Sequence, residues 1–219
     1  MNKEGSGKPG PGSPRRGKLF IIAAPSGGGK TSLVSALMAD DEQLALSISH
    51  TTRKPRSRKS SGKQYHFVDK EKFKSLVSED AFLEYAMVFG NYYGTHAGAL
   101  NTQLDQGLDV ILEIDWQGAA QVRRIFPDCC SIFILPPSFE VLRQRLARRA
   151  EDSEGVIDRR MRDAQSEISH WAEFDYLVIN EVFETALLDL KTIISYTRSG
   201  RNFEQDQRAL LLAKLLGNR

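Results

Sequence analysis

The chain has 219 residues, of which 41% are hydrophobic and 26% are charged, and its formal net charge is +2. This composition is typical of a globular protein and excludes wholesale disorder, and so small a net charge does not by itself indicate a nucleic-acid or membrane partner. Cys129 and Cys130 are adjacent, which is neither a CxxC pair nor a metal-ligand spacing, and no run of about 18 apolar residues is present. We therefore expect one folding unit in a reducing, cytoplasmic compartment.

From Lys18 onward, short apolar runs alternate with helical patterns. Residues 1–17 come before them and are mostly Gly, Pro, Ser and basic residues, so we expect a disordered tail there. The expected core strands are 19–24, 110–114, 131–135 and 176–179, with helices at 30–38 and 184–197. Apolar strands that alternate with helices predict a mainly parallel sheet covered by helices on both faces.

The segment between the first helix and residue 110 has a different texture. Short mixed strands are expected there around polar turns, at 47–49, 65–68, 82–87 and 92–95. We interpret residues 47–96 as a small β-rich lobe inserted into a core that is formed by residues 18–46 and 97–219.

A last helical pattern covers residues 204–216 and carries a strong leucine face. An exposed apolar face needs a partner. The pattern therefore predicts either a closing helix docked on the core or a contact in a homo-oligomer, and both remain open.

Residues 24–31 read APSGGGKT, directly after the first apolar run and before the first expected helix. They match the phosphate-loop pattern G-x-x-x-x-G-K-[ST], except that Ala24 replaces the first glycine. Glycines let successive N–H groups face an anion at a helix N-terminus, where the helix dipole favours negative charge. Lys30 would reach the β and γ phosphates, and the Thr31 hydroxyl would join a Mg²⁺ shell. The motif predicts an NTP or NDP site, which GTPases, ATPases and small-molecule kinases all share.

Six basic residues crowd residues 53–63. One interpretation is a nucleic-acid patch, because clustered Lys and Arg bind phosphates without regard to sequence. The other is a pocket for one small anion, in which Arg53 and Arg56 fork onto a single phosphate from either side of Pro55. Solvated charge is expected for Arg58, Lys59 and Lys63.

Glu84 lies in an apolar setting within residues 82–95, a segment that ends in a tyrosine-rich stretch. A buried carboxylate needs donor partners, because burying it unpaired is costly. Guanine offers two such donors, a ring N–H and an exocyclic amine, and tyrosine hydroxyls suit the phosphate of the same acceptor. The segment alone equally allows an exposed Glu84 with the tyrosines in the core.

Five motifs occur in order along the chain: APSGGGKTS, SHTTRKPR, GKQYHFV, GNYYGTH and ILEIDWQG. Together they resemble the guanylate kinase family over essentially the whole chain from Lys18. The resemblance implies an α/β fold, with a P-loop three-layer parallel-sheet core, the lobe as a nucleoside-monophosphate site, and a helical lid at about 143–165. It also implies transfer of the γ-phosphoryl group of ATP to GMP with Mg²⁺ as the cofactor, use of dGMP being left open, and no nucleic-acid or membrane partner.

The motif and the resemblance together give a set of candidate site residues. The ATP side is expected at Ala24, Pro25, Ser26, Gly27, Gly28, Gly29, Lys30, Thr31, Ser32 and Asn180. Guanine is expected to contact Ser49, Glu84 and Thr95, and its phosphate Arg53, Arg56, Tyr65 and Tyr93, with Glu113 and Asp115 facing the acceptor. The expected catalytic residues are Lys30, Arg53 and the lid arginines Arg145, Arg149 and Arg160, and the expected metal ligand is Thr31. Glu113 stands where the family more often has aspartate, and residues 147–153 lack the glycines of the family's lid.

Such a reaction needs no general base, because the attacking phosphate oxygen is already anionic, so we expect catalysis from alignment and positive charge. Three other functions remain open: an inactive guanylate kinase-like protein-interaction module, a nucleic-acid binder and a kinase for another monophosphate. The complete set of loop and phosphate-gripping residues argues against the first, and Glu84 argues against the last. The four histidines have no metal-ligand spacing and are expected to be structural.

Overall fold

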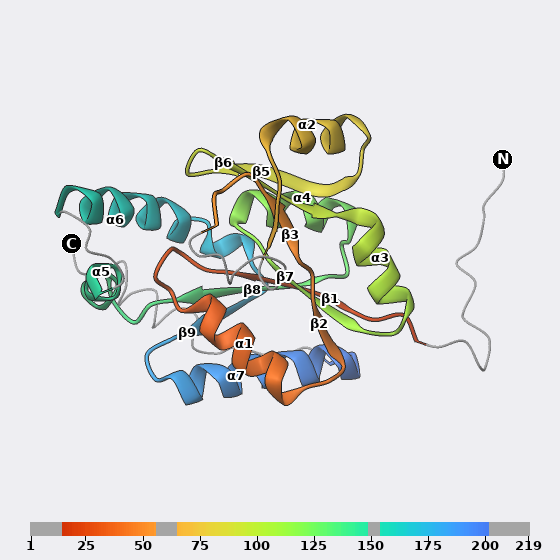
Figure 1. The fold of residues 1–219 in the computed structure, drawn as a ribbon. Helices are drawn as coiled ribbons and strands as arrows, with labels where there is room; N and C mark the ends of the chain where they lie inside the picture. Colours follow the sequence, from red (N-terminus) through yellow and green to blue (C-terminus); the bar gives the residue numbers. More distant parts are fainter. Residues whose placement is uncertain (1–14, 56–64, 149–153, 202–219) are drawn as a thin grey trace.

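The structure is a computed structural model that describes residues 15–55, 65–148 and 154–201. Its centre is a sheet of five parallel strands in the order β2-β7-β1-β8-β9 (Figure 1). The strands are β1 (Leu19–Ala23), β2 (Leu44–Leu46), β7 (Asp109–Glu113), β8 (Cys130–Leu135) and β9 (Tyr176–Ile179). Residues along β1 and β8 are buried on both faces of the sheet, which is why these strands read as unbroken apolar runs.

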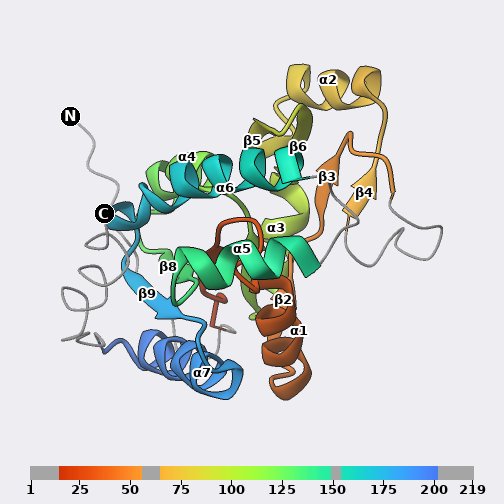
Figure 2. The ribbon, with the colours of Figure 1, turned by 90° about the vertical axis from the view of Figure 1, so that its left-hand side faces the viewer.

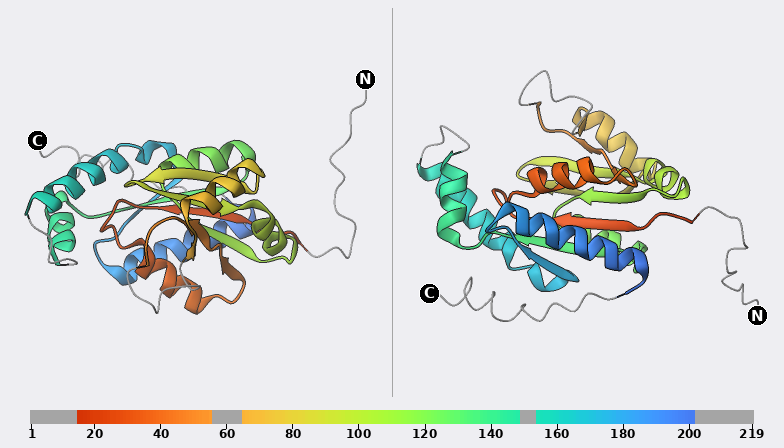
Figure 3. Two further views of the ribbon diagram at one scale, coloured as in Figure 1. Left: turned by 45° about the horizontal axis from the view of Figure 1, so that its top comes forward. Right: turned by 90° about the horizontal axis from the view of Figure 1, so that it is seen from below.

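Helices cover both faces of this sheet and make it the middle of three layers. On one face lie α1 (Lys30–Asp40) and α7 (Phe183–Ser199), which run side by side in the right-hand view of Figure 3. The other face is packed by α3 (Ala97–Asp105), α4 (Trp116–Ile125), α5 (Phe139–Arg148) and α6 (Glu154–Ile168). A short 3₁₀ helix, Trp171–Glu173, precedes β9.

A second sheet has four strands in the order β4-β3-β6-β5. They are β3 (Ser49–Thr51), β4 (Tyr65–Phe67), β5 (Phe82–Val88) and β6 (Asn91–His96). Helix α2 (Lys70–Ser78) packs on this sheet through Phe73, whose ring stacks on Phe82 and Tyr92 with centroid distances of 4.6 and 5.3 Å. The small sheet and α2 lie at the opposite end of the molecule from α7 (Figure 2).

The predicted fold class is confirmed, and the expected core strands agree with the structure to within one residue at each end. The strand expected at 47–49 is wrong, because β2 ends at Leu46 in the large sheet and β3 begins at Ser49 in the small one. Helix α2 was not expected, since only Phe73 and Leu76 of its nine residues are buried and the segment reads as polar.

The tail was expected to extend to residue 17, but its last residues are held against the core. Arg15 forms an ion pair with Asp109 at 2.9 Å, and the Gly17 N–H donates to the Leu104 carbonyl at 2.8 Å. The helix expected at 204–216 lies outside the described residues, and the proposed division into core, lobe and lid stays a prediction. No helix within the described ranges is both long and apolar enough to cross a membrane.

Candidate active site

The glycine-rich stretch forms the turn between β1 and α1. Gly27 and Gly29 have φ angles of +88° and +93°, in the left-handed region that favours glycine, and Gly29 is the N-cap of α1. A Cβ at Gly29 would lie 2.1 Å from the amide nitrogen of Asn180. Ala24 is not among the positive-φ residues, so its replacement of the motif's first glycine introduces no backbone strain here.

Residues at the ends of β8 and β9 and on α5 hold this turn in place. Asn180 follows β9. Its backbone N–H donates to the Leu135 carbonyl at 2.8 Å, and its Nδ2 donates to the Gly28 carbonyl at 2.9 Å. Arg145 in turn donates to the Asn180 carbonyl at 2.8 Å. The phosphate-loop backbone is thus fixed in shape by contacts from residues far along the chain.

The turn opens on a cavity of about 410 Å³ that residues of both sheets line. Most of the predicted site residues meet there: Ala24, Pro25, Ser26, Gly27, Gly29, Lys30, Thr31, Ser49, Arg53, Tyr65, Glu84, Tyr93, Glu113 and Asp115. The structure adds lining residues that were not predicted: Ala86, Val88, Phe89, Asn91, Ile114 and Glu167.

Glu84 combines near-complete burial with a place in the cavity wall. Glu84 is only 3% exposed, and its Oε1 accepts a hydrogen bond from the Thr95 hydroxyl at 2.6 Å. Burial, with a further contribution from the Asp115 charge, raises the pKa of this carboxyl to about 7. Gly118 in α4 makes room for it, because a Cβ there would lie 2.5 Å from Glu84 Oε2.

Arg53 and two tyrosines form another part of the wall. The guanidinium carbon of Arg53 lies 5.3 Å from the centroid of the Tyr65 ring, and Tyr65 meets Tyr93 edge-on with centroids 5.8 Å apart. This contact orients the arginine by cation–π attraction beside two phenol groups. A planar cation with neighbouring hydroxyls is well suited to binding a phosphate.

Lys30 and the carboxylates after β7 complete the cavity near the loop. Lys30 Nζ donates to the Ile114 carbonyl at 3.4 Å. Asp115 is the N-cap of α4 and accepts the Gly118 N–H and the Gln117 amide, both at 3.0 Å. Asp115 therefore has a structural task as well as its predicted position beside the acceptor.

Residues 16–197 match the family described as guanylate kinase. The chain belongs to the guanylate kinase family. It is 54% identical over 201 residues to a guanylate kinase from Alkalilimnicola ehrlichii, covering 92% of this chain and 99% of that protein. A relative from Haemophilus influenzae, also a guanylate kinase, is 52% identical over 204 residues and covers 92% and 98% of the two chains.

A solved structure gives the same family. The crystal structure of guanylate kinase from Anaplasma phagocytophilum matches with a TM-score of 0.70 and 32% identity, covering 94% of this chain and 98% of that one. The resemblance noted from the motifs is confirmed, and with it the phosphotransferase class of enzyme.

Several of the residues expected to contact nucleotides in a guanylate kinase do not line the cavity. Thr95 is fully buried and supports Glu84. Gly28 is buried within the phosphate loop, and Asn180 is buried beneath it. Ser32 is exposed on α1. Arg160 contacts the Ser26 hydroxyl of the loop, and Arg145 contacts the Asn180 carbonyl that lies beneath the loop. Arg56 and Arg149 lie outside the described residues. The nucleotide-binding roles of all these residues stay predictions.

Sequence reasoning missed Glu167, which lines the cavity from α6. Its Oε2 accepts the Ser26 N–H at 3.0 Å, and 141 positions separate the two residues along the chain. No motif of the family resemblance includes this residue, which lies just beyond the lid expected at about 143–165. Only the fold brings it to the phosphate loop.

Proposed function

We propose that the chain transfers the γ-phosphoryl group of ATP to GMP and produces ADP and GDP. One observation carries the proposal: the phosphate loop with Lys30, the Arg53–tyrosine wall and the buried carboxyl of Glu84 all line one cavity. A cavity with these three parts has the chemistry to bring the phosphates of two nucleotides together. An inactive interaction module is not favoured, because Lys30, Thr31, Arg53, Tyr65 and Tyr93, which are predicted to bind or transfer phosphate, line the cavity.

Guanine is the base that best fits the chemistry around Glu84. A carboxylate only accepts hydrogen bonds, and guanine presents two donors, the ring N–H and the exocyclic amine, along one edge. Adenine presents an acceptor where guanine has its ring N–H, so it would leave the buried carboxylate with an unfavourable contact. Ser49, which is 8% exposed, adds a hydroxyl on the same wall.

The phosphate of GMP would then be bound by Arg53, Tyr65 and Tyr93, and the phosphates of ATP by the amides of the loop. The transferring group would lie between Lys30 and Arg53, where positive charge stabilises the transition state. Alignment of the two phosphates supplies the rest of the rate enhancement, because binding both nucleotides in one cavity converts a bimolecular reaction into a unimolecular one.

Mg²⁺ is the cofactor that we propose, with Thr31 as its protein ligand. In the described part of the chain, no group of three His, Cys, Asp or Glu residues could hold a metal ion. Thr31 is exposed in the first turn of α1 and lines the cavity, and Mg²⁺ in kinases is commonly held by one or two protein groups together with substrate phosphates and water. When bound, the ion would supply positive charge at the phosphates.

ADP release measured with ATP, Mg²⁺ and each of GMP, dGMP, AMP, UMP and dTMP tests this function. We expect rapid ADP release with GMP and none above background with AMP or the pyrimidine nucleotides. The dGMP measurement shows whether the ribose 2′-hydroxyl is read. Equal rates with AMP would overturn the guanine assignment, and no release with any acceptor would overturn the function.

A further inference from the structure

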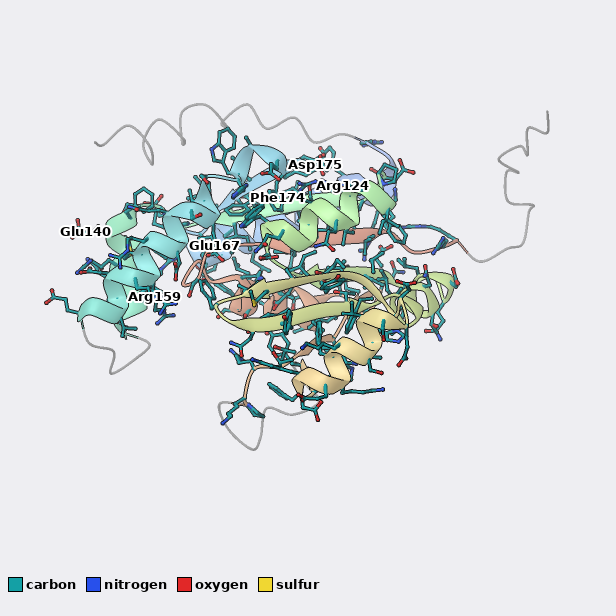
Figure 4. The ribbon with its side chains drawn as sticks, turned by 90° about the horizontal axis from the view of Figure 1, so that it is seen from above. Arg124, Glu140, Arg159, Glu167, Phe174 and Asp175 are labelled. Carbon is teal, nitrogen blue, oxygen red and sulfur yellow. The ribbon has the colours of Figure 1, made fainter. Side chains whose placement is uncertain are left out.

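Helix α6 contacts Ser26 of the phosphate loop at two different atoms. The carboxyl of Glu167 accepts the Ser26 backbone N–H at 3.0 Å, and Arg160 donates to the Ser26 hydroxyl at 3.1 Å. Arg160 and Glu167 are seven residues apart, about two turns of a helix with 3.6 residues per turn, so they share one face of α6. Figure 4 shows Glu167 where α6 reaches the turn that follows β1.

A carboxyl group is an unexpected neighbour for a loop that binds phosphate. The N–H groups of such a loop point at an anion, and a second negative charge in the same cavity opposes the binding of that anion. Around Glu167 lie Lys30, whose charge lowers the pKa of the carboxyl, and Asp115 and Asp163, whose charges raise it. Burial is the largest effect, and the pKa of Glu167 is raised overall, so its surroundings do not favour the charged form.

The useful property of Glu167 is therefore the acceptor oxygen, whose position is fixed by a helix. Without it, the Ser26 N–H at the edge of the cavity would have no partner within the loop, and the loop would be free to turn that amide. A shift of about 1 Å in a group that positions phosphates is enough to reduce a reaction rate substantially.

We propose that Glu167 is a positioning residue for phosphoryl transfer. It holds the Ser26 N–H in place while Arg160 holds the Ser26 hydroxyl, so that Lys30 and the other backbone amides of the loop are correctly placed for the phosphates of ATP. The proposal rests on the proposed function and adds to it a residue outside every predicted motif. It also means that the position of α6 and the shape of the phosphate loop are set together, because Ser26 is bound to α6 through both its backbone and its side chain.

Steady-state kinetics of three variants test the proposal, with kcat and both KM values measured on the wild type in parallel. Glu167→Met keeps the length of the side chain and removes the acceptor, and we expect it to lower kcat about 10- to 100-fold. The KM for GMP should stay within about twofold, since the acceptor wall is untouched. Glu167→Gln keeps an acceptor oxygen without the charge, and it should restore kcat to within about threefold of the wild type.

Gln165→Met is the matched control, on the exposed face of the same helix and apart from the contacts that Arg160 and Glu167 make with the loop; it should leave all three parameters unchanged. Melting temperatures of all the variants show whether each one folds, and Glu167→Ala replaces the Met variant if that variant does not melt cooperatively.

Three results would overturn the positioning role in a wild-type protein that is active with GMP. The first is wild-type kcat in Glu167→Met. The second is a Gln variant as slow as the Met variant, which would make the charge the essential property. The third is a Gln variant with a KM for ATP well below that of the wild type, which would make Glu167 an electrostatic brake on ATP binding. A wild-type protein that releases no ADP with GMP would instead overturn the proposed function, so the two failures are distinguishable.

Discussion

The Thr95 hydroxyl donates to Glu84 Oε1 across neighbouring strands of the small sheet, at 2.6 Å and almost out of contact with water. This bond fixes the direction of the carboxyl before a nucleotide is bound. Because the ordering is already present in the free protein, little further entropy is lost when guanine binds. Thr95 thus supports Glu84 in this geometry, and the direct contact to guanine that was expected of it stays a prediction.

The raised pKa of Glu84 predicts a pH dependence of GMP binding. The pKa is shifted from 4.5 to about 7, so the free folded protein loses this proton only as the pH rises through neutrality. Since only the carboxylate accepts from both guanine donors, kcat/KM for GMP should rise between about pH 5.5 and pH 8. The phosphate of GMP titrates near pH 6, so the quantity to plot is the ratio of wild type to Glu84→Gln. A ratio that is flat across this range would contradict the assignment.

Gly118→Ala should weaken GMP binding without unfolding the protein. The added Cβ would come within 2.5 Å of Glu84 Oε2 and push the carboxyl from its place, while alanine favours the helix by about 1 kcal/mol over glycine. We expect the KM for GMP to rise about tenfold with little change in melting temperature. Gly155→Ala is the control, because a Cβ there meets nothing within 4 Å. An unchanged KM for GMP in Gly118→Ala would show that displacing the Glu84 carboxyl does not affect GMP binding.

Lys30→Met should separate catalysis from acceptor binding. Lys30 lines the cavity from the first turn of α1, and its charge is expected at the transferring phosphoryl group. Removing one such group in an enclosed site lowers kcat about 10²- to 10³-fold. GMP affinity, measured by equilibrium titration, should stay nearly intact. Wild-type turnover in this variant would exclude the catalytic role.

His50 predicts a loss of stability at acidic pH. Burial, with added repulsion from His66, His96 and Lys72, lowers the pKa of His50 from 6.5 to about 4. As the pH falls from 6.5 toward 4, the unfolded chain takes up a proton that the folded chain does not, so the free energy of unfolding decreases. Urea unfolding at about pH 7.5 and pH 5 should therefore show a smaller decrease in His50→Gln than in the wild type. Equal decreases in the two proteins would exclude His50 as a source of the pH dependence.

The parts of this molecule that could be predicted from sequence are those with local signals. Strands buried on both faces are continuous apolar runs, and the loop from Ala24 to Thr31 carries its geometry in its glycines. The burial of Glu84 was open from its segment alone and favoured by the family resemblance, and the structure shows it buried.

The parts that could not be predicted depend on contacts between distant segments. Asn180 was expected on the ATP side, and that role stays a prediction; its hydrogen bond to the Gly28 carbonyl joins residues 152 positions apart. Glu167 meets Ser26 only through the packing of α6, and α2 packs on the small sheet through Phe73. The contacts of Asn180 and Glu167 have no local pattern in the sequence, whereas α2 does carry local signals, an N-cap at Asp69 and the apolar residues Phe73 and Leu76 about one turn apart.

The central claim is that Glu84 selects guanine through two donors. Inosine monophosphate keeps the ring N–H of guanine and lacks its exocyclic amine, so comparing it with GMP isolates one hydrogen bond to the carboxylate. We expect the wild type to prefer GMP by about 10- to 100-fold in kcat/KM, and Glu84→Gln to lose most of that preference. A Glu84→Gln variant that keeps the full preference for GMP would contradict the account.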